Sequence, residues 1–298
     1  QGCDLYKDKV ENLAWDQDRI SEAVITAENS DVVILCVGLD ETLEGEEGDT
    51  GNSDASGDKV DLHLPKVQEE LIEKVTAVGK PTIVVLMAGS AIDLNYAQDN
   101  CNGILLAWYP GARGGRAVAD LLFGKESPSG KLPVTFYKDL EGMPEFTDYS
   151  MKNRTYRYME KEALYPFGYG LTYSDTCVTE AEVVGEVSAE SDIVLKATVK
   201  NNGTVDTDEV VQVYIKDLDS PLAVRNYSLC GFKRVSLKAG EEKSVEFTIS
   251  NKAMNIVDED GNRYIAGKHF RLFAGVSQPD TRSAELTGHK PAEVEIAL

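Results

Sequence analysis

Positive charge is scarce in this chain. Among 298 residues, 30 lysines and arginines stand against 51 aspartates and glutamates, and the net charge is −21. Nucleic acids and anionic membranes are bound by basic surfaces, so neither is an expected partner. No apolar run reaches the roughly 20 residues that a membrane-spanning helix needs. The charge balance instead fits a neutral or cationic ligand, or simple solubility.

Cysteine and histidine are also few. The five cysteines have no paired spacing, which indicates neither a disulfide scaffold nor a zinc site and favours a reducing, cytoplasmic compartment over secretion. Cys36 lies within an apolar stretch and is expected to be a small buried residue. The three histidines are far apart in sequence, so a Ser-His-Asp site is not expected, and His63 is interpreted as a surface or packing residue.

The sequence also lacks the residue spacings of calcium-binding and nucleotide-binding motifs. The acidic stretch at residues 40–61 lacks the EF-hand ligand spacing, so calcium is disfavoured. The glycine-rich stretch at residues 109–116 has neither P-loop nor dinucleotide-binding spacing and is interpreted as a tight turn. We therefore expect no metal and no cofactor.

The first half of the chain alternates helical and strand patterns. Short, continuously apolar strands alternating with amphipathic helices are typical of a parallel sheet with helices on both faces, an α/β sandwich assigned to residues 1–137. The strands are expected at residues 32–38, 82–87 and 104–108, and the helices at residues 16–29, from Pro65 to about 78, and at 116–123.

The second half changes class. Residues 138–176 form an aromatic-rich connection that is expected to pack between two domains rather than to act as a flexible linker. Residues 177–298 contain evenly spaced short strands and turn signals, which predict an antiparallel β-sandwich of immunoglobulin or fibronectin III type. Its strands are expected at residues 193–199, 210–215, 231–237, 245–249 and 270–274.

The acidic loop, about residues 40–61, is the strongest candidate site. It follows the first apolar strand, at the strand end where open parallel sheets bind ligands. Glu44, Glu46 and Glu47 lie within four positions, and their mutual repulsion would raise at least one pKa toward the range of a general acid. A merely solvated acidic loop is the alternative that composition favours.

An ordered series of motifs makes the chain resemble glycoside hydrolase family 3, the β-glucosidases and β-xylosidases, over the C-terminal half of that family. Each motif is weak alone, but their order along the chain is specific. They are GCD at residues 2–4, GLDETLEGE at 38–46, LHLP at 62–65 with Gln68, WYPGARGG at 108–115, SPSGKLPVTF at 127–136, RTYRY at 154–158, YPFGYG at 165–170, VKNNG at 199–203, VVQVY at 210–214 and LCGFKRV at 229–235.

The resemblance implies an α/β-sandwich domain followed by a fibronectin type III-like domain. It also implies retaining, exo-acting hydrolysis of terminal β-D-glycosyl residues, in which one carboxylate attacks the sugar and a second serves as acid and then base. The family's acid/base glutamate comes from the long loop, which assigns it to Glu46, with Glu47 and Glu44 as alternates. A β-glucosidase is the first expectation, with a β-glucoside or oligosaccharide as substrate.

One family feature is missing. The nucleophilic aspartate of the family stands in a Ser-Asp-Trp context in an N-terminal barrel, and that tripeptide does not occur here. The barrel is therefore expected on a second polypeptide or a missing N-terminal segment, and this chain alone is expected to be inactive. The alternatives are a β-xylosidase of the same family and a non-catalytic carbohydrate-binding or assembly module.

Overall fold

The structure is a computed structural model that describes residues 1–7, 15–44, 59 and 61–298. The chain forms two compact units. The first contains residues 1–120 and 137–141, and the second contains residues 121–136 and 142–298. The domain limits placed at residues 137 and 176 stay predictions.

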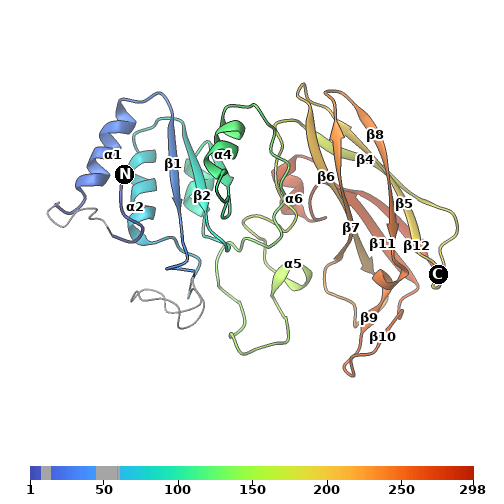
Figure 1. Ribbon diagram of the computed structural model, residues 1–298. Helices are drawn as coiled ribbons and strands as arrows, with labels where there is room; N and C mark the ends of the chain where they lie inside the picture. The colour runs from blue at the N-terminus through green and yellow to red at the C-terminus, as the bar shows by residue number, and fades with distance from the viewer. Residues whose placement is uncertain (8–14, 45–58, 60) are drawn as a thin grey trace. The chain divides into compact units, whose positions relative to one another are not determined.

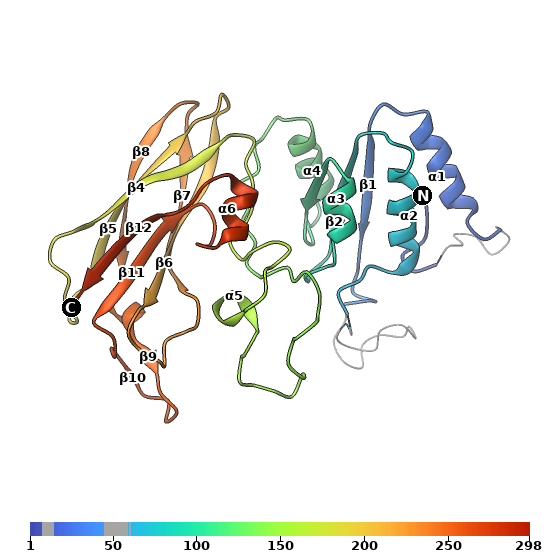
Figure 2. The same cartoon turned by 180° about the vertical axis from the view of Figure 1, so that it is seen from behind.

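The first unit is built on a parallel sheet, as predicted. Its strands lie in the order β1-β2-β3, with Val33 of β1 opposite Thr82 of β2. Helices α1 and α2 lie together on one side of this sheet, and α4 lies on the other side (Figures 1 and 2). The elements are α1 (Asp18–Glu28), β1 (Val33–Gly38), α2 (Lys66–Thr76), β2 (Thr82–Met87), α3 (Asn95–Asn100), β3 (Gly103–Leu106) and α4 (Gly114–Leu122).

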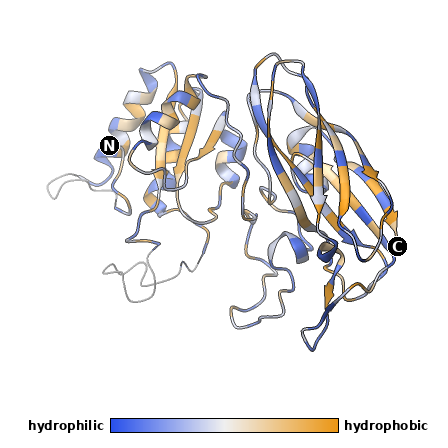
Figure 3. Ribbon diagram, turned by 45° about the vertical axis from the view of Figure 1, so that its right-hand side comes forward, coloured by the Kyte–Doolittle hydropathy of each residue, from blue (hydrophilic) through white to orange (hydrophobic). Residues whose placement is uncertain are grey.

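The core of this unit follows the predicted apolar patterns. In α2, Val67, Leu71 and Val75 recur at helical spacing, and all three are buried. The central strand β2 is buried along most of its length because it has a neighbour on each side. In Figure 3 the strands of this sheet stand out as hydrophobic ribbon, whereas the helices carry both colours.

Strand β1 departs from the expectation that helices cover both faces of the sheet. It is an edge strand, and Ile34 is 45% exposed. Cys36 lies on the same face and is also exposed, so the prediction of a buried cysteine is wrong. An apolar run alone does not distinguish an edge strand from a central one.

The second unit is an antiparallel β-sandwich, which confirms the predicted fold class. One sheet has the order β4-β5-β8 and the other β12-β11-β6-β7, and their inward residues form one apolar core. The strands are β4 (Thr176–Val184), β5 (Ile193–Asn201), β6 (Thr207–Asp217), β7 (Ser228–Leu237), β8 (Glu242–Ile249), β11 (His269–Gly275) and β12 (Ala292–Ala297). Shorter elements are α5 (Thr155–Tyr158), η1 (Asn251–Met254), β9 (Ile256–Val257), β10 (Arg263–Tyr264) and α6 (Thr281–Thr287).

The aromatic-rich connection packs on the β-sandwich. The rings of Tyr156 and Phe167 stack with centroids 4.3 Å apart, and Tyr214 of β6 meets both edge-on. Gln212 donates a hydrogen bond of 2.9 Å to the carbonyl of Gly168. These contacts explain the aromatic composition of the segment within the second unit. Whether the segment also packs on the first unit stays a prediction.

Candidate active site

The acidic loop begins at a tightly constrained point, the carboxyl end of β1. Gly38 has φ 152°, and a Cβ there would lie 1.8 Å from the carbonyl oxygen of Met87, so only glycine fits. The buried Gln68 of α2 pairs with both backbone groups of Gly38, accepting from its N–H at 2.7 Å and donating to its carbonyl at 2.8 Å. The chain therefore leaves the sheet in a fixed direction.

A single helical turn follows. The N–H of Glu44 donates to the carbonyl of Asp40 at 2.9 Å, and the Asp40 carboxylate accepts from the N–H and hydroxyl of Thr42. Leu39 and Leu43 are 7% and 6% exposed and fix the turn to the core. These local contacts determine where the Glu44 side chain starts.

Glu44 accepts three hydrogen bonds from residues distant in sequence. The N–H of Gly89 donates at 2.6 Å, and the hydroxyls of Ser90 and Tyr109 donate to the same carboxylate. Gly89 and Ser90 follow β2, and Tyr109 follows β3. Because the carboxyl ends of parallel strands meet at one edge of the sheet, the segments that follow β2 and β3 both reach a carboxylate that follows β1.

The contacts of Glu44 stabilise its ionised form. Partial burial raises the pKa of Glu44, but the hydrogen bonds from Ser90, Tyr109 and Gly89 and the nearby Lys59 ammonium lower it more, so the pKa lies below its usual range. Burial and the bond to Glu44 raise the pKa of Tyr109 well above its usual value, which keeps the phenol protonated as a donor.

Lys59 stands near the other end of the acidic loop and reaches the same turn. Its Nζ donates to the carbonyl of Ala91 at 3.1 Å. Burial lowers the pKa of Lys59, while the negative charges of Glu44 and Asp61 act in the opposite direction. The turn at residues 89–91 thus contacts described residues from both ends of the loop.

The backbone at Trp108 adds a constraint. The third strand was expected to extend to Trp108, but β3 ends at Leu106 and Trp108 has φ 52°. A left-handed backbone at a bulky residue costs roughly 1–2 kcal/mol, and such conformations gather at functional sites. The turn at Trp108 immediately precedes Tyr109, the donor to Glu44.

The predicted site residues fall in two groups. Glu46 and Glu47 lie outside the described residues, and Glu44 is described with a pKa below its usual range. His63 is largely exposed and forms a 2.9 Å contact with Glu69, which is consistent with a surface residue.

Sequence reasoning did not assign roles to Tyr109 and Ser90, which contact Glu44, or to Lys59, which contacts the same turn. Tyr109 stands in a quoted motif, which was a usable signal. Ser90 and Lys59 carried none beyond lying near strand ends or in the loop.

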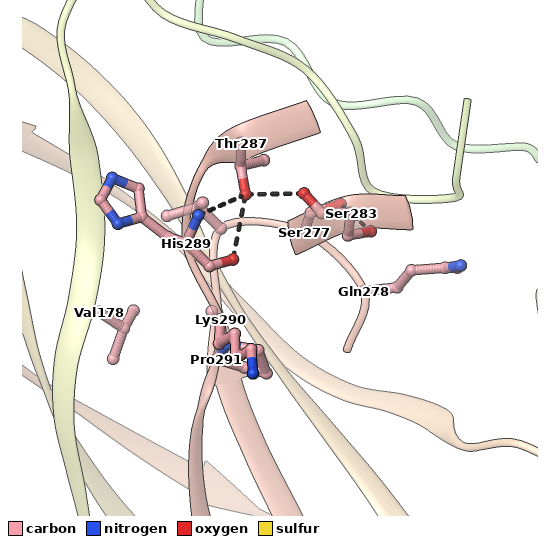
Figure 4. Close-up of a pocket in the computed structure, with 10 residues that line it drawn as sticks. Val178, Ser277, Gln278, Ser283, Thr287, His289, Lys290 and Pro291 are labelled. Atoms are coloured by element: carbon pink, nitrogen blue, oxygen red, sulfur yellow. Dashed lines mark hydrogen bonds between the residues drawn. The ribbon is translucent and has the colours of Figure 1, made fainter. Parts of the chain in front are cut away.

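A small hollow in the β-sandwich is a second candidate, and Figure 4 shows its lining. Ser277 and Ser283 join their hydroxyls at 2.9 Å, and Thr287 donates to the carbonyls of Ser283 and His289. The hollow measures about 10 Å³, which is space for about one water molecule. It is too small for a sugar.

Two features are absent from the part of the chain that the structure describes. Among residues 1–7, 15–44, 59 and 61–298, no group of three or more histidine, cysteine, aspartate or glutamate side chains could hold a metal ion. Within the same described part of the chain, no helix has the length and apolar character needed to cross a bilayer.

Comparisons with known proteins bear on both units. A family model described as "Glycosyl hydrolase family 3 C-terminal domain" matches residues 4–173, and one described as "Fibronectin type III-like domain" matches residues 209–278. The chain is 40% identical over 270 residues to a "Xylan 1,4-beta-xylosidase" of Xylanibacter ruminicola, a match that covers 89% of the chain and 31% of the relative.

Two further proteins complete the comparison. A "Beta-xylosidase" of Formosa agariphila is 34% identical over 295 residues, which cover 96% of the chain and 39% of the relative. The crystal structure of a GH3 beta-glucosidase of Bifidobacterium adolescentis is similar with a TM-score of 0.81 and 30% identity, covering 97% of the chain and 42% of that protein. The chain spans about a third of the length of these curated relatives.

Proposed function

The chain belongs to glycosyl hydrolase family 3, and from that membership we propose that it is the part of a retaining, exo-acting β-glycosidase that supplies the general acid/base. The observation that carries the proposal is that the segments after β2 and β3 both donate hydrogen bonds to Glu44 at the carboxyl-end edge of the sheet. These hydrogen bonds hold Glu44, near the start of the acidic loop, at the edge where parallel sheets bind ligands.

We assign the acid/base role to Glu46, with Glu47 as the first alternate. A general acid must hold a proton near the working pH. The donors around Glu44 favour its ionised form, which suits an anchor better than a proton donor and supports Glu46 over Glu44. Glu46 follows Glu44 by two positions in the sequence.

The nucleophile in this proposal is an aspartate of a barrel domain on another segment or polypeptide. In a retaining glycosidase the two carboxyl groups lie about 5 Å apart, on opposite sides of the scissile bond. This chain would protonate the departing oxygen, and then deprotonate the water that releases the sugar. The chain alone should therefore be inactive.

The substrate is proposed to be a terminal β-D-xylosyl residue, with β-D-glucosyl as the second candidate. A relative named a xylan 1,4-beta-xylosidase is 40% identical to the chain, whereas the compared relatives named β-glucosidases are 30–34% identical. These values favour xylose over the glucose preference taken from the commoner family activity.

The test joins this chain to a polypeptide that carries the family's N-terminal barrel. Hydrolysis of 4-nitrophenyl β-xyloside should appear in the assembly and be negligible for the chain alone. Glu46→Gln should lower kcat by about 10²–10⁴-fold, the usual contribution of a general acid. It should also retain more activity on a dinitrophenyl glycoside, whose leaving group needs no proton.

Three results would contradict the proposal. Robust turnover by the single chain would mean that the nucleophile is present here. An assembly in which Glu46→Gln and Glu47→Gln both keep full activity would move the acid/base elsewhere. An assembly that binds xylo-oligosaccharides but hydrolyses nothing would favour the non-catalytic carbohydrate-binding module.

A further inference from the structure

The two ends of the acidic loop contact one turn. At the first end, the Glu44 carboxylate accepts the N–H of Gly89 at 2.6 Å and the hydroxyl of Ser90. At the other end, the Lys59 ammonium donates to the carbonyl of Ala91 at 3.1 Å. Three consecutive residues after β2 therefore hold residues that lie 15 positions apart in the sequence.

The two contacts reinforce each other electrostatically. Glu44 is an anion and Lys59 a cation, and each charge stabilises the charged form of the other. Both side chains are partly buried, where such attraction is stronger than in bulk water.

Tyr109 is the third residue that donates a hydrogen bond to the Glu44 carboxylate. Its hydroxyl donates to Glu44, and its ring lies against Gly89, where an added Cβ would be 2.8 Å from the ring carbon Cε2. Trp108, the residue before this tyrosine, has a left-handed backbone with φ 52°. A conformation that costs free energy persists when surrounding contacts require it, so the position of Tyr109 is strongly specified.

We propose that Glu44 and Lys59 are positioning residues that fasten the two ends of the acid/base loop to the turn at residues 89–91, with Tyr109 and Ser90 completing the Glu44 contact. Glu44 and Lys59 would thereby set the points at which the chain enters and leaves the segment that carries the proposed acid/base. This inference rests on the proposed function for its catalytic consequence. The fastening itself is a property of this chain alone.

The first test uses the single chain and no substrate. Lys59 is the only lysine or arginine between residues 40 and 61, so trypsin reports on its accessibility there. Cleavage after Lys59 should be slow in the unmodified chain and several-fold faster in Glu44→Gln and Ser90→Ala. Glu41→Gln, which removes a charge from an exposed neighbour, is the matched control and should match the unmodified chain. Equal cleavage of Glu44→Gln and Glu41→Gln would overturn the proposal, whatever the activity of the assembled enzyme.

The second test uses the assembly with the barrel. Misplacing a catalytic group by about 1 Å can lower the rate about 100-fold, so Glu44→Gln should lower kcat by about 10–100-fold with little change in KM. Ser90→Ala should lower it less, and Ser90→Thr, which restores a hydroxyl, should recover activity. Tyr109→Phe should also lower kcat, because it removes a hydroxyl that donates to Glu44, whereas Tyr149→Phe, which changes an 84% exposed tyrosine, should leave kcat unchanged.

The pH profile separates positioning from catalysis. A positioning variant keeps the basic limb of the kcat/KM profile, because the acid/base still titrates. Loss of that limb in Glu44→Gln, together with rescue of its activity by azide, would make Glu44 the acid/base itself and overturn the proposal. Suppose that the assembly is inactive but trypsin cleaves Glu44→Gln after Lys59 faster than it cleaves the unmodified chain. That result would contradict the proposed function and still support the role of Glu44 in holding the loop end to the turn.

Discussion

A buried ion pair in the second unit gives the sharpest prediction on stability. The Nζ of Lys131 lies 2.8 Å from Glu209 Oε1, and the two side chains are 8% and 2% exposed. Glu209 also accepts from the hydroxyl of Thr176 and the N–H of Val210, both at 2.6 Å. Lys131 donates to the carbonyl of Gly170 at 2.6 Å. The pair joins residues 127–136 to strand β6.

Replacing Lys131 by Met removes the cation and leaves the carboxylate of Glu209 buried. Removing one partner of a buried pair costs about 3–5 kcal/mol, because the other charge remains without compensation. The hydrogen bonds from Thr176 and Val210 to Glu209 persist, so the expected loss of unfolding free energy is about 3 kcal/mol. The double variant Lys131→Met, Glu209→Met removes both charges and should lose less than either single variant.

The assay is urea unfolding followed by far-ultraviolet circular dichroism, with the two single variants and the double variant compared as a cycle. Lys196→Met is the matched control, because Lys196 pairs with Glu182 at 3.4 Å in an exposed position. Exposed pairs contribute about 0–1 kcal/mol. A loss below about 1 kcal/mol for Lys131→Met would refute the reasoning that the pair is desolvated and coupled.

Three further predictions concern titration and reactivity. Cys36 is exposed and should react with a thiol reagent much faster than Cys230, because burial raises the pKa of Cys230 to about 12 and suppresses its thiolate; equal rates measured by mass spectrometry would contradict this. The hydrogen bond to Glu69 raises the pKa of His63, so NMR titration should give a pKa above 6.5, and Glu69→Gln should lower that pKa. The contribution of this contact to folding stability should be lost as pH rises through the folded pKa of His63. Because the pKa of Glu44 is lowered, its stabilising contacts are present above the unfolded pKa of about 4.3 and are lost as pH falls through the folded value. Glu44→Gln should therefore destabilise at pH 7 and converge with the unmodified chain in acid; a pH-independent loss in thermal melts would contradict the assignment.

The fold was predictable where local pattern and burial agree. The stripe of α2 and the limits of β2 followed from the sequence, since both elements are bounded by proline and glycine signals. Helix α6 was missed because it is too short to show a periodic stripe. Its ends carried recognisable signals. Asp280 caps the N-terminus of the helix, and Gly288, with φ 77°, ends the helix at its C-terminus.

The candidate site was predictable in location but only partly in composition. A parallel sheet directs attention to the carboxyl edge of the strands, and the acidic loop begins there. The role of Ser90 depends on a contact with Glu44, 46 positions earlier, and the sequence around Ser90 shows no pattern for it. Likewise the left-handed turn at Trp108 looked like continued strand, because apolar residues extend beyond the last ladder contact.

The turn at residues 89–91 also bears on how this family region could change over time. The hydrogen bonds of Glu44 and Lys59 to this turn involve only these two residues and the turn itself. Each doubling of a flexible loop's length costs only about 0.6 kcal/mol. Insertions between Glu44 and Lys59 should therefore cost little free energy of folding. The turn would offer the same hydrogen-bonding groups to Glu44 and Lys59 whatever the number of residues between them.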